Sequence, residues 1–509
     1  MGMETQVETK LHPVLSYDWG LMAPELVVLV TAILVLVCDL LLPRKNPRRF
    51  LGAFAVLGVL LAMALMIAHL GGEPKEILGE QFRMDAFSQA FKLIILAAVA
   101  FSLVQIIYDG GRKEADTRAE YLYLMLTAAL GAMIMVSSAD LIPMYIGLET
   151  MSIASYIMAG IRKRDVKSNE AAFKYIVYGG AASAALLYGF SFIYGLTGST
   201  NLYTIGERLP EAWNSGYSFI LMIGFGLMLV GFGFKVSTVP FHMWAPDVYE
   251  GSPIPTVSFL SVASKAAGLA MMMRVFFLAF YGDLMESKLP AIGWLLSIVA
   301  AASMIIGTTT ALHQVDVKRL MAYSSIGQAG YLLVPFAMMS TLMFDQMLFF
   351  LVAYLLMNLG LFTVLLVVGQ SGDTNLRIFA GLYRRSPWLA LAATLFLLSL
   401  AGFPFTAGFF GKFYILLGTL AMGNWWLPVL MAVTTVISYA FYFKIVRQMY
   451  LRVPAVADRL KVPPVLGLLI LFAAVGTLVL GVYPGLAFDL MHQYFPVIQQ
   501  FFTPATPAL

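Results

Sequence analysis

Three lysines and one glutamate occupy positions where a membrane-spanning segment tolerates charge least. Lys235, Lys265 and Lys412 each lie deep inside an apolar run long enough to cross a bilayer, and Glu149 lies in the middle of another. A charge near the bilayer centre costs about 2.5–3.5 kcal/mol on insertion scales. A structural ion pair is the alternative explanation for each residue. Several such charges in one chain nevertheless favour a buried path along which a charge moves, and a proton fits that role best.

Lysine suits this chemistry only if its surroundings change its proton affinity. An unperturbed side chain, with a pKa of about 10.4, stays protonated at neutral pH and passes nothing on. Burial makes a lysine easier to deprotonate, and a neighbouring carboxylate opposes that effect. We therefore interpret Glu149 and Lys235 as a switch, in which the lysine keeps its proton while the two are together and releases it when they part. Lys265 would receive the proton through water, and Lys412 would pass it toward the outer face.

Two further side chains are candidate proton relays. Lys174 lies about one turn inside its apolar segment, where snorkelling to the interface explains it equally well. His242 closely follows Pro240, and imidazole titrates near neutrality, although an ordinary interfacial histidine is an equal alternative. The five histidines show no metal-ligand spacing, so we predict no metal site.

Composition limits the class of protein. The chain has 509 residues, of which 60% are hydrophobic and 12% charged, which predicts an all-α polytopic membrane protein. Its basic residues lie in short loops between apolar segments, which argues against nucleic acid as a partner. Cys38 is the only cysteine, so a disulfide or a cysteine-ligated iron–sulfur cluster cannot form within this chain alone. Nucleotide-binding glycine motifs are absent, so any nucleotide chemistry belongs to another subunit.

Apolar runs of about 20 residues predict about fourteen transmembrane helices. Their expected ranges are 24–42, 51–70, 86–108, 119–137, 140–160, 170–195, 218–242, 254–281, 290–311, 317–339, 343–369, 387–418, 425–449 and 464–484.

The loops between these spans predict the orientation. Nineteen Lys and Arg residues fall in the odd-numbered connections, and five lie on the opposite side. Because positive loops stay in the cytoplasm, both termini should face away from it. We expect a multi-pass protein of the bacterial cytoplasmic (inner) membrane, whose first span serves as its own insertion signal.

Two spans carry proline near a lysine. Pro240 follows Lys235 in span 7, and Pro404 precedes Lys412 in span 12, so both helices should be broken there. Interrupted spans at matching positions indicate a duplicated transporter core, with unrelated proline kinks as the alternative. The two spans are five apart, and an odd repeat reverses direction, so spans 4–8 and 9–13 would be inverted copies. The expected domains are three N-terminal helices, the first repeat, the second repeat, and a last helix with a tail, over residues 1–118, 119–281, 290–449 and 450–509.

The residues around these lysines resemble a known family. The segments are KVSTVPFHMWAPDVYEGSPIPTVSFLSVASKAAGLA (235–270), DLIPMYIGLETMSIASYIMAG (140–160), NEAAFKYIVYGG (169–180), VKRLMAYSSIGQAGYLL (317–333) and SLAGFPFTAGFFGKFYIL (399–416). They are similar to the antiporter-like subunits of bacterial NADH:quinone oxidoreductase, the respiratory complex I, and among them to subunit N. The resemblance covers essentially the whole chain. In two places the chain departs from the family pattern: GFPF replaces the commoner G-I-P-P in span 12, and Gln328 stands where many relatives have histidine.

This resemblance implies a proton-translocating module. Glu149 and Lys235 would form the pair, Lys265 the central site and Lys412 the terminal site, and Lys174 falls on a lysine that the family carries in span 6. FMN, iron–sulfur clusters and quinone would belong to partner subunits, with no cofactor in this chain. The implied partners are other membrane-arm subunits, namely the antiporter-like subunit M and small subunits such as K and J, together with the lipid bilayer. The chain would be a non-redox subunit of the translocase, inactive when isolated.

Two other functions stay open on the sequence. The nearest is a related subunit of a multisubunit sodium/proton antiporter or of a membrane-bound hydrogenase, since these share the inverted repeats. The other is a stand-alone secondary transporter for a small solute, which would need a polar pocket at the middle of the membrane. No polar cluster beyond the proton path is evident in the sequence.

Overall fold

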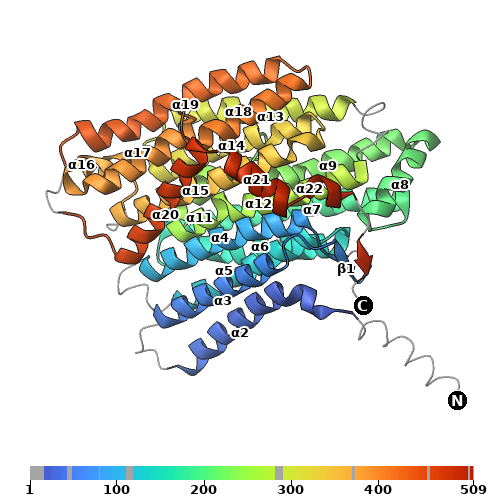
Figure 1. Cartoon of the computed structure of the whole chain (residues 1–509), viewed down its shortest axis with the longest axis horizontal. Coiled ribbons are helices and arrows are strands. Elements are labelled where there is room, and N and C mark those ends of the chain that lie inside the picture. The colour runs from blue at the N-terminus through green and yellow to red at the C-terminus, as the bar shows by residue number, and fades with distance from the viewer. Residues whose placement is uncertain are drawn as a thin grey trace.

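The computed structural model describes residues 17–42, 49–79, 81–109, 118–280, 290–369, 373–454, 459–502 and 505–507. Both ends of the chain, whose side of the membrane the loop charges predict, lie outside these residues. Apart from one small sheet, the described chain is helical (Figure 1). Twelve of its helices are long and apolar enough to cross a membrane, and two shorter apolar helices accompany them. The predicted all-α polytopic class is therefore confirmed.

Helices form at every predicted apolar range. The N-terminal part contains η1 (Trp19–Met22), α2 (Ala23–Leu41), α3 (Arg49–Ala68), β1 (Lys75–Ile77), β2 (Phe82–Met84), α4 (Ala86–Tyr108) and α5 (Arg118–Ser137). Next come α6 (Leu141–Ala159), α7 (Val166–Thr197), α8 (Leu202–Ala212), η3 (Trp213–Tyr217), α9 (Ser218–Val236), α10 (Trp244–Gly251), α11 (Ile254–Ser261), α12 (Ala263–Arg274) and η4 (Val275–Phe280). They are followed by α13 (Pro290–Ala311), α14 (Val317–Ala337), η6 (Thr341–Met343), α15 (Phe344–Val368), η7 (Leu376–Phe379), α16 (Leu382–Arg385), α17 (Pro387–Ala401), α18 (Ala407–Ala421) and α19 (Trp426–Leu451). The C-terminal part contains α20 (Pro464–Val482), α21 (Gly485–Tyr494), α22 (Val497–Phe501) and β3 (Thr506–Pro507).

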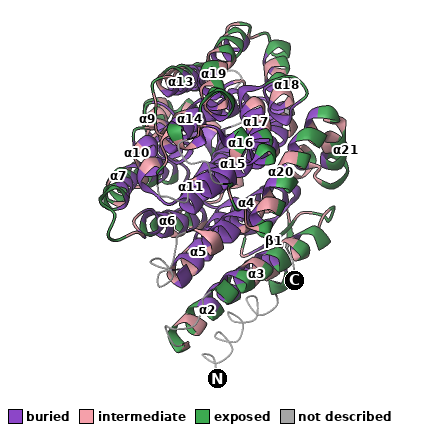
Figure 2. Ribbon diagram, turned by 90° about the vertical axis from the view of Figure 1, so that its left-hand side faces the viewer, coloured by how far each residue is buried: buried purple, intermediate pink, exposed green. Residues whose placement is uncertain are grey.

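The long helices run side by side, with α2 and α3 at one flank and α13 and α19 at the other (Figure 1). Figure 2 shows the buried residues concentrated on α4, α11, α14 and α15, between outer helices that carry exposed residues. The most apolar stretch of the segment from α11 to η4 is entirely buried, whereas only a third of the corresponding stretch in α7 or in α19 is buried. Lys265 is therefore carried by the most enclosed segment of the bundle.

Polar side chains begin several of these helices. Asp85 starts α4 and accepts a hydrogen bond from the backbone of Ser88 at 2.8 Å, while the Ser88 hydroxyl accepts one from the backbone of Asp85. The same kind of side-chain cap starts four other helices, at Asp140, Asp165, Asn201 and Asp316. Such caps satisfy backbone N–H groups that a helix leaves unpaired. These caps thus help to fix where α4, α6, α7, α8 and α14 begin.

One capped loop occurs twice. Asp140, which starts α6, accepts a hydrogen bond from the hydroxyl of Thr200 at 2.7 Å and pairs with Asn201 in an isolated bridge. The same arrangement, at the start of α14, is made by Asp316, Thr374 and Asn375. In Figure 1, α8 follows the first loop at the right end of the bundle, and α16 follows the second at the left. The two copies therefore lie at opposite ends.

Both predicted breaks occur. Helix α9 ends at Val236, where Ser237 adopts a left-handed conformation (φ 65°), so the break begins before Pro240. The apolar range 387–418 is divided into α17 and α18 by five residues around Pro404, with Gly402 at φ 83° and Phe405 at φ 66°. Positive φ suits glycine, which supplies the sharp end of α17.

A third break, in the predicted span 254–281, was not anticipated. Val262 leaves helical geometry, with φ −119° and ψ −67°, and separates α11 from α12. Neither glycine nor proline occupies that position, so the break carries no local sequence signal. It lies three residues before Lys265.

Candidate functional site

Lys235 lies in the last turn of α9 and is only 4% exposed. Its Nζ donates a hydrogen bond to the hydroxyl of Ser152 on α6 at 2.9 Å. Glu149 lies one turn before Ser152 on the same face of α6. Among the described residues no direct ion pair joins Glu149 to Lys235, so the lysine is anchored by a neutral hydroxyl next to the carboxylate. Sequence reasoning missed Ser152, whose three-residue spacing from Glu149 was the available signal.

Glu149 also belongs to a partly exposed face of α6. This face also carries Tyr145 and Thr150, which are partly exposed, and four isoleucines that are each about half exposed, Ile142, Ile146, Ile153 and Ile157. Glu149 itself is of intermediate exposure, and its buried Oε1 has no hydrogen-bond partner among the described residues. A carboxylate near the middle of a membrane-spanning helix would be costly against lipid. This face of α6 is therefore poorly suited to lipid alone.

Lys265, in the first turn of α12, contacts α14 directly. Its Nζ donates to the carbonyl oxygen of Ser325 at 2.6 Å and to the hydroxyl of the same residue. That hydroxyl also accepts a hydrogen bond from Tyr354 of α15 at 3.2 Å, and the hydroxyl of Tyr249 of α10 lies 3.4 Å away. Ser325 is thus the centre of a polar cluster contributed by four helices. The transfer of a proton to Lys265 through water stays a prediction.

Lys412 is held by the break in span 12. Its Nζ donates to the carbonyl oxygen of Leu400 at 2.8 Å and lies 4.8 Å from the ring centre of Tyr331. The Leu400 carbonyl is in the last turn of α17, where the break leaves carbonyls without helical partners. A second contact, at 3.5 Å, reaches the carbonyl of Ala401. The helix break that the sequence predicts thus supplies the ligands of the lysine next to it.

Polar groups occupy the space between the central and terminal lysines, although no hydrogen bond joins Ser325 to Ser324 among the described residues. Ser324, adjacent to the partner of Lys265, shares a hydrogen bond with the hydroxyl of Tyr442 on α19 at 2.5 Å. Nε2 of Gln328 then lies 3.4 Å from that hydroxyl. The same nitrogen donates at 3.1 Å to the carbonyl of Leu400, which accepts from Lys412.

The connection runs through α14 and α19 and is largely buried. Ser324, Gln328 and Tyr442 are each at most 3% exposed. Oε1 of Gln328 and both polar side-chain atoms of Asn358 on α15 have no partner among the described residues. Buried polar atoms of this kind bind water in proteins. The two lysines therefore belong to one polar interior rather than to separate sites.

Lys174 lies elsewhere, in an ion-pair cluster at the end of the bundle. Its Nζ is 2.6 Å from Asp247 and 2.7 Å from Glu170, and Arg319 is 2.5 Å from the other oxygen of Asp247. Asp247 follows the predicted span 218–242. Partial burial raises the pKa of Asp247, but its hydrogen bonds to Lys174 and Arg319 outweigh burial and hold the pKa below its ordinary value. The relay role of Lys174 stays a prediction.

His242 lies between α9 and α10 and is of intermediate exposure. Its Nδ1 is buried and has no hydrogen-bond partner among the described residues. None of the described lysines or carboxylates makes an ion pair with it. Only their positions in the sequence place His242 near Lys235. Its relay role also stays a prediction.

A separate charged cluster lies where α4 and α12 meet the C-terminal tail. Asp85 pairs with Arg83 and with Arg274, both at 2.8 Å, and all three side chains are fully buried. The backbone carbonyl of Gln500 in α22 accepts a hydrogen bond from the guanidinium of Arg83 at 2.7 Å. The guanidinium of Arg274 stacks on Phe501 and Phe87 at 5.3 and 4.6 Å. Arg274 thus has the structural partner that a buried guanidinium needs.

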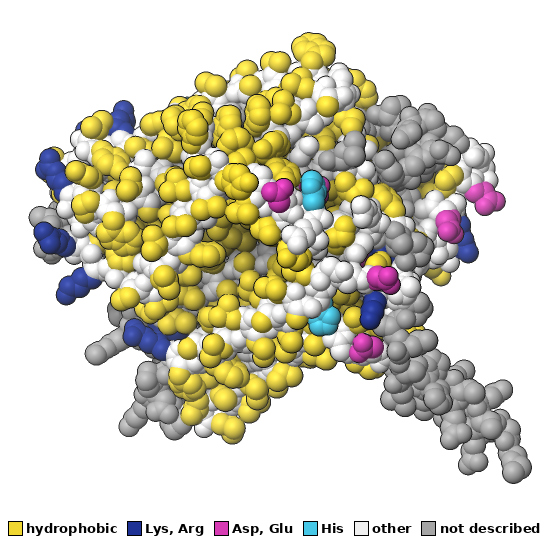
Figure 3. Space-filling view, in the orientation of Figure 1, with side chains coloured by type: hydrophobic (Ala, Val, Ile, Leu, Met, Phe, Trp, Pro, Cys, Tyr) yellow, Lys and Arg dark blue, Asp and Glu magenta, His cyan; other side chains and the backbone are white. Residues whose placement is uncertain are grey.

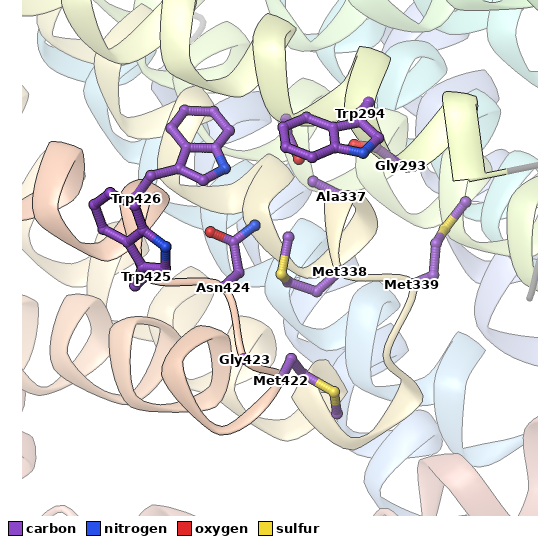
Figure 4. A pocket seen from close by; sticks show the side chains of 11 residues that line it. Gly293, Trp294, Ala337, Met338, Met339, Met422, Gly423, Asn424, Trp425 and Trp426 are labelled. Atoms are coloured by element: carbon purple, nitrogen blue, oxygen red, sulfur yellow. The ribbon is translucent and has the colours of Figure 1, made fainter.

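A cavity of about 520 Å³ opens where α13, α14, α18 and α19 meet. Figure 4 shows Trp294 and Trp426 on facing sides of it, with Asn424 below them. The two indoles are parallel, with ring centres 6.2 Å apart. Tryptophan is typical of the level of lipid headgroups. The cavity is lined by none of the predicted site residues.

Comparison with known proteins agrees with this geometry. The family described as NADH:quinone oxidoreductase/Mrp antiporter, TM, matches residues 138–438, which include all four predicted proton-path residues. NADH-quinone oxidoreductase subunit N of Brevibacillus brevis is 45% identical, over 96% of this chain and 97% of that protein. The chain belongs to the subunit N family. The resemblance that the sequence motifs indicated is therefore confirmed.

Solved structures extend the comparison. A chain of respiratory complex I from Thermus thermophilus with bound aureothin has a TM-score of 0.77 at 31% identity, covering 92% of this chain and 98% of that one. A chain of the Mrp complex from Dietzia sp. DQ12-45-1b has a TM-score of 0.81 at 20% identity, covering 95% and 99%. The second likeness shows the fold alone. Subunit N family members and antiporter subunits thus share one architecture, and the choice between functions rests on sequence.

Proposed function

We propose that this chain carries protons across the membrane for an NADH-quinone oxidoreductase whose electron carriers, FMN, iron–sulfur clusters and quinone, reside on partner subunits. The proposed path begins at Lys235 beside Glu149, continues to Lys265 and ends at Lys412. The carrying observation is the connected polar interior between Lys265 and Lys412. It consists of hydrogen-bonding groups from α14, α17 and α19 inside an otherwise apolar bundle.

Proton transfer through this interior needs groups that both donate and accept. The hydroxyls of Ser324, Ser325 and Tyr442 do both, whereas the amide nitrogen of Gln328 donates to Tyr442 and to the Leu400 carbonyl, and its oxygen has no partner among the described residues. Gln328 therefore orders the chain and does not itself titrate. Moving one proton against 100 mV takes about 2.3 kcal/mol. Rearrangement of buried lysines is capable of supplying an amount of this size, since one unit of pKa corresponds to about 1.4 kcal/mol.

Fourteen spans and two inverted repeats complete the proposed architecture. Helix α14 and the α17–α18 pair, counted as one broken span, add to the twelve long helices to give fourteen. The doubled Asp-Thr-Asn loop supports the inversion, because its copies start spans 5 and 10 at opposite ends of the bundle. The breaks at Ser237 and Gly402 also fall in equivalent spans, 7 and 12.

The partner surface follows from Glu149. A carboxylate in a half-exposed stripe of isoleucines requires a cover that lipid does not provide. We propose that a transmembrane helix of another membrane-arm subunit lies against this face of α6, with a hydrogen-bond donor level with Glu149. Subunit M and small subunits such as K and J are the candidates for this contact.

The orientation is testable directly. Most Lys and Arg side chains visible in Figure 3 gather at the left end of the bundle, where α16 lies, and none of the visible carboxylates do. A reporter fused at the N-terminus or after residue 509 should locate both ends on the non-cytoplasmic side, because positive loops remain in the cytoplasm. Alkaline phosphatase and a fluorescent protein are suitable paired reporters. Cytoplasmic location of either end would show that the span count is wrong by one.

Tyr442 offers a test of the path itself. The change Tyr442→Phe removes the hydroxyl that joins Ser324 to Gln328 while keeping the ring in place. We expect proton pumping to fall at least about fivefold, because the hydrogen-bonded line is cut, with the complex still assembled. Dye quenching in inverted membrane vesicles measures pumping, and native gels measure assembly.

Tyr450→Phe is the matched control, because it removes a more exposed hydroxyl from the same helix. It should leave pumping unchanged. Equal pumping in the two variants would remove Tyr442 from the path.

The function as a whole is tested by deleting the chain and supplying it again. Vesicles that lack it should lose NADH-driven acidification, and the restored chain should return it. Acidification that instead follows a sodium gradient, with NADH without effect, would favour the antiporter alternative. Copurification with flavin-bearing subunits checks the partners in the same preparation.

A further inference from the structure

The aliphatic part of the Lys235 side chain packs against a glycine of the neighbouring helix. Helices α9 and α12 pack against each other, and Gly268 of α12 faces the lysine. A Cβ built at Gly268 would lie 3.0 Å from Cγ of Lys235 and 3.4 Å from a methyl of Val236. The contact with Lys235 is tighter than an ordinary van der Waals distance, whereas the one with Val236 is at the short limit of the ordinary range. The absent side chain therefore provides the room that the stem of Lys235 occupies.

Near this contact, the side chains of Lys235 and Lys265 point in different directions. Gly268 lies one turn after Lys265 and on the same face of α12. The ammonium group of Lys235 donates to Ser152 on α6, whereas that of Lys265 donates to Ser325 on α14. No hydrogen bond links the two lysines in the described chain. A direct approach of Lys235 to Lys265, or to a water beside it, requires the head of Lys235 to turn away from Ser152.

We propose that Gly268 is a positioning residue on which the stem of Lys235 turns, so that its head swings from Ser152 toward Lys265. This inference rests on the proposed proton path. The four rotatable bonds of lysine move between staggered states, and each state needs clearance beside the stem. Gly268 supplies that clearance on the side of α12, which is also the side that carries Lys265.

The test substitutes Gly268→Ala and measures assembly and NADH-driven pumping in the same vesicles. The added methyl forces the lysine stem off its preferred rotamers, and pumping should fall about three- to tenfold with the complex assembled. Gly226→Ala is the matched control on α9, because a Cβ there meets no atom within 4 Å. It should pump normally. Normal pumping by Gly268→Ala would overturn the proposal.

A second variant separates the lysine contact from helix packing. Val236→Ala removes the other side chain that the new methyl would touch. If the defect of Gly268→Ala comes from Lys235, the double variant Gly268→Ala/Val236→Ala should remain defective. Recovery of pumping or assembly in the double variant would show that Gly268 only spaces the helices. Failure of both variants to assemble would likewise make the contact structural and overturn the proposal.

Lys235→Met in the same experiment distinguishes this inference from the proposed function. Lost pumping in Lys235→Met together with normal pumping in Gly268→Ala refutes only the pivot. Normal pumping in Lys235→Met refutes the proton path itself.

Discussion

Lys412→Met should leave the assembled complex in the membrane while NADH-driven proton pumping falls below about one tenth of the native level. Methionine fits the apolar surroundings of α18 and leaves no charge behind. The Leu400 carbonyl keeps its hydrogen bond from Gln328, whereas the Ala401 carbonyl loses its contact with the lysine, at a cost of about 1–3 kcal/mol for an unsatisfied group, which a large bundle tolerates. The line of hydrogen bonds from Tyr442 and Gln328 would then end at a group that takes no proton. Dye quenching and native gels on the same vesicles measure both quantities.

Lys444→Met is the control for this substitution. Lys444 also donates to backbone carbonyls, those of Leu312 and Gln314, but it lies outside the connected interior. Its loss should leave pumping intact. Intact pumping in Lys412→Met would place the terminal proton site elsewhere, whereas lost assembly would make Lys412 a structural residue.

Lys235→Arg should be as damaging as removal of the charge. Arginine keeps the positive charge beside Glu149 and is able to donate to Ser152, but it does not release its proton at any accessible pH. A structural ion pair would be preserved by this change, and a proton switch would not. We expect an assembled complex with pumping below about one tenth of native and a matching loss of coupled NADH oxidation.

Lys444→Arg provides the comparison, since it makes the same replacement at a carbonyl-bound lysine outside the path. Full pumping in Lys235→Arg would leave Lys235 a structural charge. A loss confined to pumping, with NADH oxidation unchanged, would mean that the switch is not coupled to turnover.

The sequence predicts the bundle well because its signals are local. Twenty-residue apolar runs place the helices, and Pro240 and Pro404 mark two of the three breaks, since proline removes a backbone donor wherever it occurs. The break at Val262 has no such residue. Neither periodicity nor residue type therefore marks it in the sequence.

The candidate site was predictable in its charges and not in its neutral partners. Lys235, Lys265 and Lys412 stand out because a charge in an apolar run is costly. Ser152 and Ser325 do not stand out, because serine in membrane helices commonly packs or bonds to its own backbone. The Leu400 carbonyl is invisible in a sequence, since every residue has one. Sequence therefore located the candidate proton carriers, and the fold was needed to identify the groups that bind each of them.

The hydrogen-bond acceptors of Lys412 affect how its side chain would respond to gaining and losing a proton. A carboxylate partner would attract the ammonium strongly and grip the neutral amine weakly, so the side chain would move each time it titrated. The backbone carbonyls exposed at the end of α17 accept a hydrogen bond from either form. Lys412 is thus positioned by backbone carbonyl dipoles rather than by a counter-ion. On the proposed path, its nitrogen would keep the same carbonyl partners in both protonation states, so the gating of proton transfer would come from motion elsewhere.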